Sequence, residues 1–120
     1  MLLDQRPGGE LVVITGATTS HSAALRVGAA HPALGGHFPG NPIVPAVVVL
    51  DAVISAAEDW LGARLRVTGL SKAKFVASLR PDELARIELV LRGQNLEFSV
   101  DRDEVTIANG SLIVTWRAAT

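Results

Sequence analysis

The sequence has no cysteine and no tyrosine, and its aromatic residues are limited to three phenylalanines and two tryptophans. Without cysteine, disulfide bonds, thiolate metal sites and cysteine nucleophiles are all excluded. Charge is also scarce: charged residues make up 19% of the chain, and 11 basic residues nearly balance 12 acidic ones, for a net charge of −1. This balance provides no global field that would attract nucleic acid or an anionic membrane.

A long hydrophobic run and a targeting segment are missing as well. The N-terminus has no basic start followed by an apolar stretch, as a secretory signal would have. The longest apolar block starts at Ile43, is interrupted by Pro45 and ends before Asp51, which is too short to span a membrane. We therefore expect a cytoplasmic protein with neither a nucleic-acid nor a membrane partner.

Hydrophobic residues, in contrast, are abundant, at 48% of a chain of only 120 residues. This length predicts a single domain, residues 1–120, with one core. A domain of this size cannot bury so much apolar surface by itself. The composition therefore predicts association with a partner subunit.

The first third of the chain has the pattern of two strands and a loop. Strands are expected over residues 11–15 and 22–27, the second returning antiparallel to the first, with residues 16–20 as their connection. Residues 28–42 are rich in glycine and proline and predict a loop. The loop is long for so small a domain, and such loops are usually functional or anchored.

A helix is expected next, from Pro45, a residue favoured at the first helical position, to Leu61, just before Gly62. Valine is a mediocre helix former, so burial must stabilise this segment. The apolar residues cover most of the helix circumference, which predicts a helix with a sheet wrapped around it. These residues are Val47, Val48, Val49, Leu50, Val53, Ile54, Ala57 and Leu61.

The remaining chain is predicted to be strands. One strong turn signal is Asn109-Gly110, which is typical of a short hairpin. Two strands, one central helix and a run of antiparallel strands indicate an α+β domain. The strands are expected over 65–78, 84–92, 96–100, 105–108 and 111–118, with turns at 80–82, 93–95 and 109–110.

Two side chains near the predicted helix could move protons. His37 lies in the Gly/Pro loop, and Asp51 follows it by fourteen residues, inside the helix. A loop histidine can also be an ordinary surface residue, the role we expect for His21 and His31. Together, a histidine and a carboxyl group could take a proton from carbon and expel a hydroxyl group.

Asp51 has two possible environments. With Ser55, Glu58 and Asp59 it could form one solvated face of the helix. It is also the first charge after Ile43, in the part of the helix that should be buried. A carboxylic acid in an apolar pocket can keep its proton and donate it, and Ser55 could then support it.

The N-terminus of the predicted helix is a third element, because its first backbone N–H groups lack helical partners and could bind a developing oxyanion. Other motifs fail. The sequence has no phosphate loop, no histidine spacing suited to zinc and no nucleophile elbow. A basic cluster is either a solvated edge or a docking patch for an acidic partner; it consists of Arg64, Arg66, Lys72, Lys74 and Arg80.

The segment from Gly36 to Pro45, Gly-His-Phe-Pro-Gly-Asn-Pro-Ile-Val-Pro, resembles the signature of the hot-dog-fold β-hydroxyacyl-acyl carrier protein dehydratases. That family carries its catalytic acid, Glu or Asp, fourteen residues beyond the histidine, at the position of Asp51. Residues 73–75 and 79–84 are similar to a second, looser family segment, so the resemblance covers about residues 30–115. Among the branches, the chain looks most like the small dehydratases of aryl polyene clusters.

The resemblance implies a hot-dog fold, in which an antiparallel sheet wraps a long central helix, and a dimer with His37 of one subunit facing Asp51 of the other. His37 would take the α-proton, Asp51 would protonate or orient the departing β-hydroxyl, and the N–H of Ala46 would bind the thioester oxygen. Further substrate-binding residues would be Phe38, Gly40, Pro45 and Val47.

The resemblance also implies the partners. The substrate would be a 3-hydroxyacyl group carried on the phosphopantetheine of acyl carrier protein, and the product a trans-2-enoyl thioester in fatty acid or polyketide biosynthesis. No metal or redox cofactor is expected. Lys72, Lys74 and Arg80 would dock the carrier protein, and the subunit would form a homodimer, a higher oligomer or a heterodimer with a homologue.

One position departs from the family pattern: Ala46 stands where the family usually has glycine. The N–H is retained, but the methyl group could crowd the thioester. Two alternatives therefore stay open. The chain could be a catalytically impaired hot-dog subunit that binds acyl chains or supports an active homologue, or it could be a hot-dog acyl thioesterase.

Overall fold

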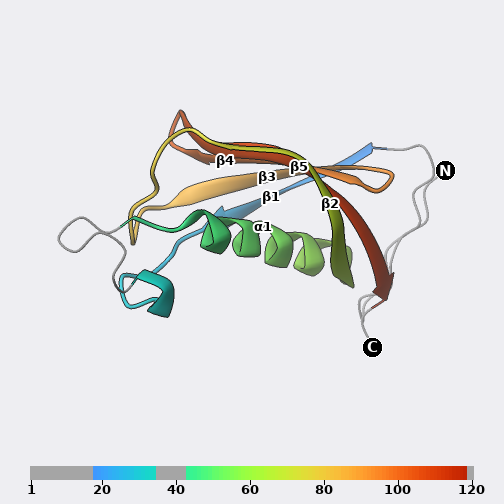
Figure 1. The fold of residues 1–120 in the computed structure, drawn as a ribbon, viewed down its shortest axis with the longest axis horizontal. Helices are drawn as coiled ribbons and strands as arrows, with labels where there is room; N and C mark the ends of the chain where they lie inside the picture. The colour runs from blue at the N-terminus through green and yellow to red at the C-terminus, as the bar shows by residue number, and fades with distance from the viewer. Residues whose placement is uncertain (1–17, 35–42, 119–120) are drawn as a thin grey trace.

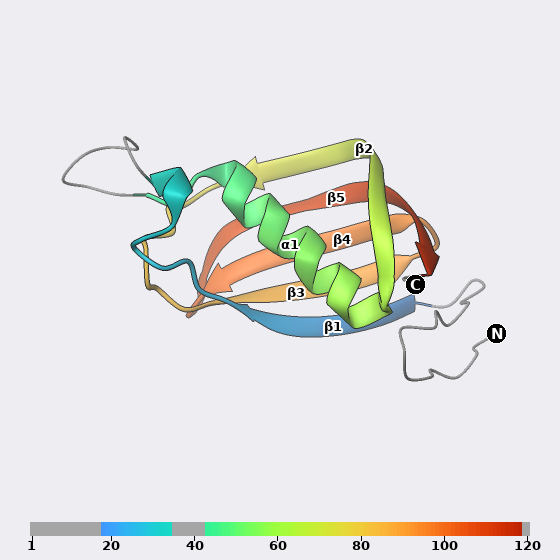
Figure 2. The same ribbon diagram turned by 90° about the horizontal axis from the view of Figure 1, so that it is seen from below.

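The computed structural model describes residues 18–34 and 43–118, in which one helix lies along one face of a five-stranded antiparallel sheet (Figures 1 and 2). The strand order is β1-β3-β4-β5-β2, so that β1 and β2 form the two edges. The elements are β1 (Thr18–Leu25), a short 3-10 turn (Pro32–Leu34), α1 (Ala46–Leu61), β2 (Ala63–Phe75), β3 (Ala85–Arg92), β4 (Asn95–Arg102) and β5 (Val105–Ala118).

The helix ends at the predicted Leu61 and begins one residue after the predicted start. Pro45 is extended, with φ −64° and ψ 151°, and α1 begins at the next residue. At the other end Gly62 adopts the left-handed conformation, with φ 63°, and its N–H donates to the Glu58 carbonyl at 2.9 Å. A left-handed glycine satisfies the last carbonyls without steric cost, which is why the helix ends there.

The burial of the helix is narrower than predicted. Every fourth residue from Val49 to Leu61 is buried against the sheet, which gives one apolar stripe. Val47, expected to be covered, is 60% exposed. The reason is that the sheet of this single chain covers only one side of α1, as Figure 2 shows, and does not wrap around it.

The core lies between α1 and the inner face of the sheet. In β3 the odd-numbered residues from Ala85 to Leu91 are buried, and in β4 the even-numbered residues from Leu96 to Val100 are buried. This alternation is the mark of a sheet with one face on a core and one on solvent. Burial of these side chains, at roughly 25 cal/mol per Å² of apolar area, provides the main drive for folding.

The predicted hairpin at Asn109-Gly110 is wrong. β5 runs through both residues without interruption, and the turn before it is at Asp103-Glu104, where Asp103 has φ 56°. A Cβ atom at Gly110 would lie 2.4 Å from the Lys72 carbonyl oxygen, so glycine is needed where β2 passes closely. Gly110 therefore marks a close backbone approach inside a strand and not a turn.

The N-terminal predictions are corrected in part. β1 starts at Thr18, so residues 18–20 belong to the strand and not to a connection, and its described partner is β3. The strand expected at 11–15 lies outside the described residues, as does the loop segment 35–42. No helix among the described residues is long and apolar enough to cross a membrane.

Candidate active site at the start of the helix

The start of α1 presents free hydrogen-bond donors. The Pro45 carbonyl accepts hydrogen bonds from the N–H groups of Val48, at 3.0 Å, and Val49, at 3.3 Å. No described residue accepts a hydrogen bond from the N–H of Ala46 or Val47, and none of the described side chains caps the helix. Two adjacent N–H groups at the positive end of the helix dipole can bind an oxygen that gains negative charge.

The position of this helix start is set by the connection between β2 and β3. The Val44 N–H donates to the Leu79 carbonyl at 2.8 Å, just before the helix. The Val76 N–H donates to the Ile107 carbonyl at 2.9 Å, which attaches the same connection to β5. These backbone bonds join three segments that are far apart in the sequence.

An apolar cavity of about 320 Å³ opens at this junction. Its base is formed by Val49, Leu79 and Ile107, each at most 2% exposed, while Phe75 and Val76 at its rim are 39% and 60% exposed. This volume is at the lower end of the range of ligand pockets. Its lining residues are Ile43, Val44, Ala46, Val49, Phe75, Val76, Ala77, Ser78, Leu79 and Ile107.

The sequence did not indicate most of this lining. Leu79 and Ile107 come from a connection and a strand that share no pattern with the helix, and only their contacts in the fold bring them to Ala46. Of the residues predicted to bind substrate, Ala46 lines the cavity, and Pro45 directly precedes it. Val47 points away, on the exposed side of the helix.

Asp51 is exposed, so the prediction that it lies in a buried part of the helix is wrong for the single chain. The alternative expectation, that Asp51 belongs to a solvated face of the helix, agrees with the structure of the single chain. Asp51 follows Val47 by one turn and shares its face, which continues to Ser55 and Asp59, all exposed and opposite the buried stripe. Within the described residues, no hydrogen bond or ion pair involves the Asp51 carboxylate.

His37, Phe38 and Gly40 lie outside the described residues. The pairing of His37 with Asp51 therefore stays a prediction. The other two histidines lie elsewhere in the fold. The ring of His21 stacks on that of Trp60, with centroids 5.3 Å apart, and His31 belongs to the turn before Leu34.

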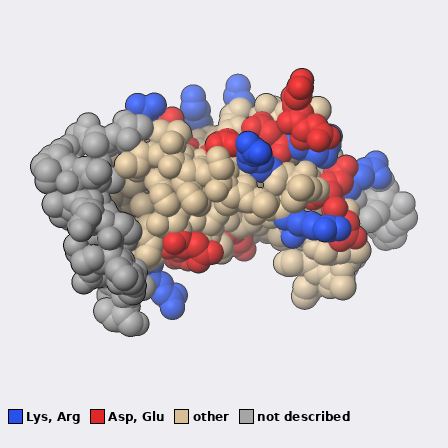
Figure 3. Space-filling view, turned by 180° about the vertical axis from the view of Figure 1, so that it is seen from behind, with Lys and Arg blue, Asp and Glu red and all other residues tan. Residues whose placement is uncertain are grey.

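The predicted docking residues lie near the cavity. Lys72 and Lys74 are exposed on the last part of β2, which ends at the rim residue Phe75, and Arg80 is exposed beside Leu79. On the face shown in Figure 3, basic and acidic side chains lie around a broad area without charged side chains.

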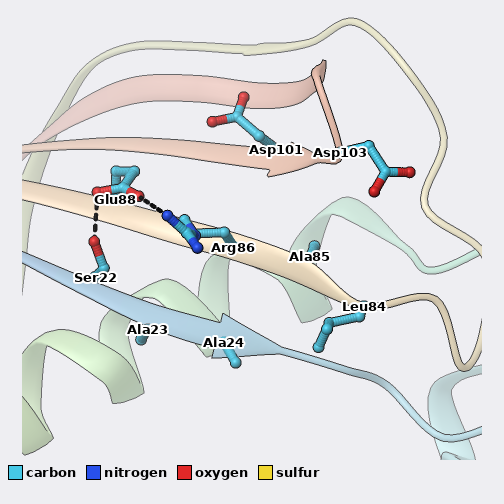
Figure 4. A pocket seen from close by; sticks show the side chains of 9 residues that line it. All are labelled: Ser22, Ala23, Ala24, Leu84, Ala85, Arg86, Glu88, Asp101 and Asp103. Carbon is cyan, nitrogen blue, oxygen red and sulfur yellow. Dashed lines mark hydrogen bonds and ion pairs between the residues drawn. The ribbon is translucent and has the colours of Figure 1, made fainter.

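A larger hollow, about 760 Å³, lies on the outer face of the sheet, on the far side from α1 (Figure 4). Ser22 Oγ donates to Glu88 Oε1 at 2.6 Å, and Arg86 Nη1 lies 3.7 Å from Glu88 Oε2. The polar groups of Ser22, Arg86 and Glu88 are therefore already engaged with one another. No group of three or more potential metal ligands occurs among residues 18–34 and 43–118.

Comparison with known proteins points to one family for most of the chain. A family model described as ApeI-like, ApeI dehydratase, matches residues 14–111. The chain is 29% identical over 90 residues to the 3-hydroxyacyl-[acyl-carrier-protein] dehydratase FabZ of Chloroflexus aggregans, an alignment that covers 69% of this chain and 62% of that protein. It is 28% identical over 101 residues to the FabZ of Syntrophobacter fumaroxidans, covering 73% and 69%.

Solved structures share the fold. The dehydratase heterocomplex ApeI:P from Xenorhabdus doucetiae matches with a TM-score of 0.70 and 20% identity, covering 95% of this chain and 96% of that chain. An uncharacterised protein from Erwinia carotovora subsp. atroseptica matches with a TM-score of 0.69 and 26% identity, covering 89% and 91%. A probable thioesterase from Bartonella henselae matches at 0.63 and 16%, covering 82% and 90%. These structures confirm the predicted hot-dog fold.

Proposed function

Because the chain belongs to the ApeI-like dehydratase family, we propose that it converts a 3-hydroxyacyl thioester on acyl carrier protein to the trans-2-enoyl thioester. The observation that supports this most is the apolar cavity beside the free N–H groups of Ala46 and Val47. An acyl chain fits an apolar cavity, and its thioester oxygen needs a donor at the mouth. The reaction belongs to fatty acid or polyketide biosynthesis, including that of aryl polyenes.

The chemistry divides between three groups. His37 removes a proton from the α-carbon, while the N–H of Ala46 stabilises the negative charge that moves onto the thioester oxygen. Asp51 protonates the β-hydroxyl, so that the bond from the β-carbon to oxygen breaks and water leaves. The electron pair of the α C–H bond becomes the double bond, and no oxidant, reductant or metal is needed.

The active site is proposed to be composite. Asp51 lies on the helix face that its own sheet leaves uncovered, next to the 60% exposed Val47. A second subunit that covers this face would bury both residues and bring its own His37 loop to Asp51.

Acyl carrier protein is the proposed donor of the substrate. Carrier proteins are acidic partners, and the exposed Lys72, Lys74 and Arg80 lie beside the cavity through which the phosphopantetheine arm would enter. Charges at the rim of an interface mainly raise the association rate and fix orientation. The phosphopantetheine belongs to the carrier, and no resident cofactor is proposed.

The test is the reaction of the purified chain, at high protein concentration, with a panel of 3-hydroxyacyl carrier proteins of increasing chain length. Loss of one water with the thioester retained, followed by mass spectrometry, is the expected result. Release of free acid would instead identify a thioesterase. A folded, associated protein that binds the acyl carrier protein without any mass change would identify an impaired, supporting subunit.

Replacement of Ala46 by glycine is expected to raise the turnover. Ala46 lines the cavity, and its methyl group lies beside the N–H that would hold the thioester. Relief of roughly 1 kcal/mol of crowding corresponds to about a three- to tenfold gain in kcat/KM, which the carrier-protein panel would measure. The matched control is Ala52→Gly, which changes the same helix outside the cavity. An equal effect of both variants, or a loss with Ala46→Gly, would show that the methyl group does not crowd the substrate.

A further inference from the structure

The connection between β2 and β3, residues 76–84, forms one wall of the apolar cavity beside the start of α1 (Figures 1 and 2). The residues of the connection that line the cavity are Val76, Ala77, Ser78 and Leu79. A segment that is neither a helix nor a strand has no continuous ladder of backbone hydrogen bonds. Its shape, and with it the shape of the cavity, therefore depends on individual bonds to the rest of the fold.

Backbone bonds hold the connection on both sides of Ser78. Before Ser78, the Val76 N–H donates to the Ile107 carbonyl at 2.9 Å. After it, the Leu79 carbonyl accepts a hydrogen bond from the Val44 N–H at 2.8 Å. No described backbone N–H donates to the Ser78 carbonyl itself. The peptide between Ser78 and Leu79 therefore depends on a side chain for its orientation.

Arg102 provides that side chain. Its Nη1 donates to the Ser78 carbonyl at 2.6 Å and to Glu83 Oε1 at 3.2 Å. Glu83 Oε1 also accepts a hydrogen bond from the Arg80 N–H at 2.8 Å, so the same guanidinium holds the turn of the connection. β4 ends at Arg102, which pairs with Val105, so the sheet fixes the backbone from which this side chain extends. One side chain thus attaches the connection to a rigid strand.

The ion pair of Arg102 with Glu83 is the least exposed one among the described residues. Its side chains are 26% and 33% exposed, whereas those of Arg86 and Glu88 are 71% and 41% exposed. Exposed ion pairs contribute little to stability, but a partly buried charge that binds a backbone carbonyl is a stronger restraint. Loss of the Arg102 side chain would leave the Ser78 carbonyl to water, and the peptide would lose its fixed orientation.

This peptide is connected to the start of α1. The Leu79 carbonyl binds the N–H of Val44, two residues before Ala46, whose own N–H is the proposed donor to the thioester oxygen. Pro45 lies between them with φ −64°, and its ring prevents rotation about that bond, so a shift of Val44 also moves Ala46. Misplacement of a catalytic group by about 1 Å can cost about 10²-fold in rate. The orientation of the peptide after Ser78 therefore bears on the reacting carbonyl.

We propose that Arg102 is a positioning residue for the dehydration: through the Ser78 carbonyl it fixes the cavity wall and the N–H of Ala46. This deepens the proposed function and rests on it, because that N–H binds the thioester oxygen of the proposed reaction. Arg102 is not among the described residues that line the cavity. It therefore acts through the backbone and not by contact with the substrate.

The test replaces Arg102 by methionine, which keeps an unbranched side chain but cannot donate. On the carrier-protein panel kcat is expected to fall about tenfold, because the N–H of Ala46 is needed most in the transition state. KM should change less than about threefold, since the apolar base that binds the acyl chain remains. Arg102→Lys can still donate to the Ser78 carbonyl and should restore kcat to within about threefold of the wild-type value.

Amide hydrogen exchange provides a readout that needs no activity. Exchange of the Val44 N–H, followed by NMR, should become about tenfold faster in R102M, because its acceptor, the Leu79 carbonyl, is no longer held in place. Exchange in the middle of β3, at Leu89, should not change. In R102K the Val44 N–H should exchange nearly as in the wild-type chain.

Two control variants separate positioning from a general loss of charge. Glu83→Gln removes the ion pair but keeps an oxygen for the Arg80 N–H, and Arg102 can still donate to Ser78. Arg86→Met removes an exposed arginine from the neighbouring strand. Both variants should keep kcat within about twofold. If R102M does not fold, Arg102→Gln takes its place, since its side chain is two bonds too short to donate where Nη1 lies, and the same loss is expected.

The outcomes distinguish this proposal from the proposed function. An unchanged kcat in the Met or Gln variant, no recovery in R102K, or an equal loss in Glu83→Gln would overturn the role of Arg102. A rise in KM alone would also overturn it. Faster exchange of Val44 in R102M without dehydration by the wild-type chain would support the link from Arg102 to the helix start and contradict the dehydratase. Wild-type dehydration with no effect of the Arg102 variants on either readout would do the reverse.

Discussion

Replacement of Asp51 by asparagine is expected to lower the dehydration rate by about 10²- to 10⁴-fold, the usual contribution of a general acid. Asparagine keeps the size of the side chain but cannot protonate the departing hydroxyl. Because the carboxylate is exposed in the single chain and bonds to no described residue, the free energy of unfolding of the isolated subunit should hardly change. Mass spectrometry of the carrier-bound product and thermal unfolding of the same samples measure the two quantities.

The same helix provides a matched control for this prediction. Asp59 lies on the same exposed face as Asp51, two turns further along. Asp59→Asn removes an identical charge and should leave the rate within about twofold of the wild-type rate, since a surface charge at this distance is largely screened. Normal turnover by Asp51→Asn, or equal losses in both variants, would rule out the acid role of Asp51.

Local signals in the sequence predicted the helix well. Pro45 and Gly62 act on their own neighbours through fixed φ and left-handed geometry, so the ends of α1 follow from residues next to them. The strands were harder to delimit. β2 starts two residues before the predicted residue 65, because Gly62 ends the helix and the strand follows directly. It ends three residues before the predicted residue 78, in a connection whose Leu79 carbonyl accepts a hydrogen bond from the Val44 N–H.

The predictions were wrong or incomplete where the environment of a residue is set by a part of the chain that is distant in sequence. Asn109-Gly110 has the chemistry of a hairpin turn, but the carbonyl of Lys72, nearly forty residues away, demands a glycine within a strand. The cavity base of Leu79 and Ile107 has the same origin. No local pattern contains such contacts, and only the assembled sheet creates them.

At Asp51 two sequence signals predict opposite environments. The apolar run before it predicts burial, and its spacing with Ser55 and Asp59 predicts a solvated face. In the single chain Asp51 is exposed, as the spacing predicts, because the sheet covers only the stripe from Val49 to Leu61. The apolar run still requires an explanation, which the proposed second subunit provides: a surplus of hydrophobic residues can belong to a core shared between chains.

Replacement of His37 by alanine is expected to lower the dehydration rate strongly, since the α-proton then loses its proposed base. General bases contribute about 10²- to 10⁴-fold, and a residual rate would come from the N–H of Ala46 and from binding alone. The carrier-protein panel measures the rate, and binding of the acyl carrier protein should persist. His31→Ala is the control, because His31 belongs to a turn before the helix and has no proposed catalytic role.

A mixture of His37→Ala and Asp51→Asn chains tests the composite site directly. Each variant alone lacks one group in both of its sites. Random exchange makes half of the dimers mixed, and one of the two sites in a mixed dimer then has both His37 and Asp51. At high protein concentration the mixture should therefore recover about a quarter of the wild-type rate. If His37 acted with Asp51 of its own chain, no dimer would contain an intact site, and mixing would recover nothing.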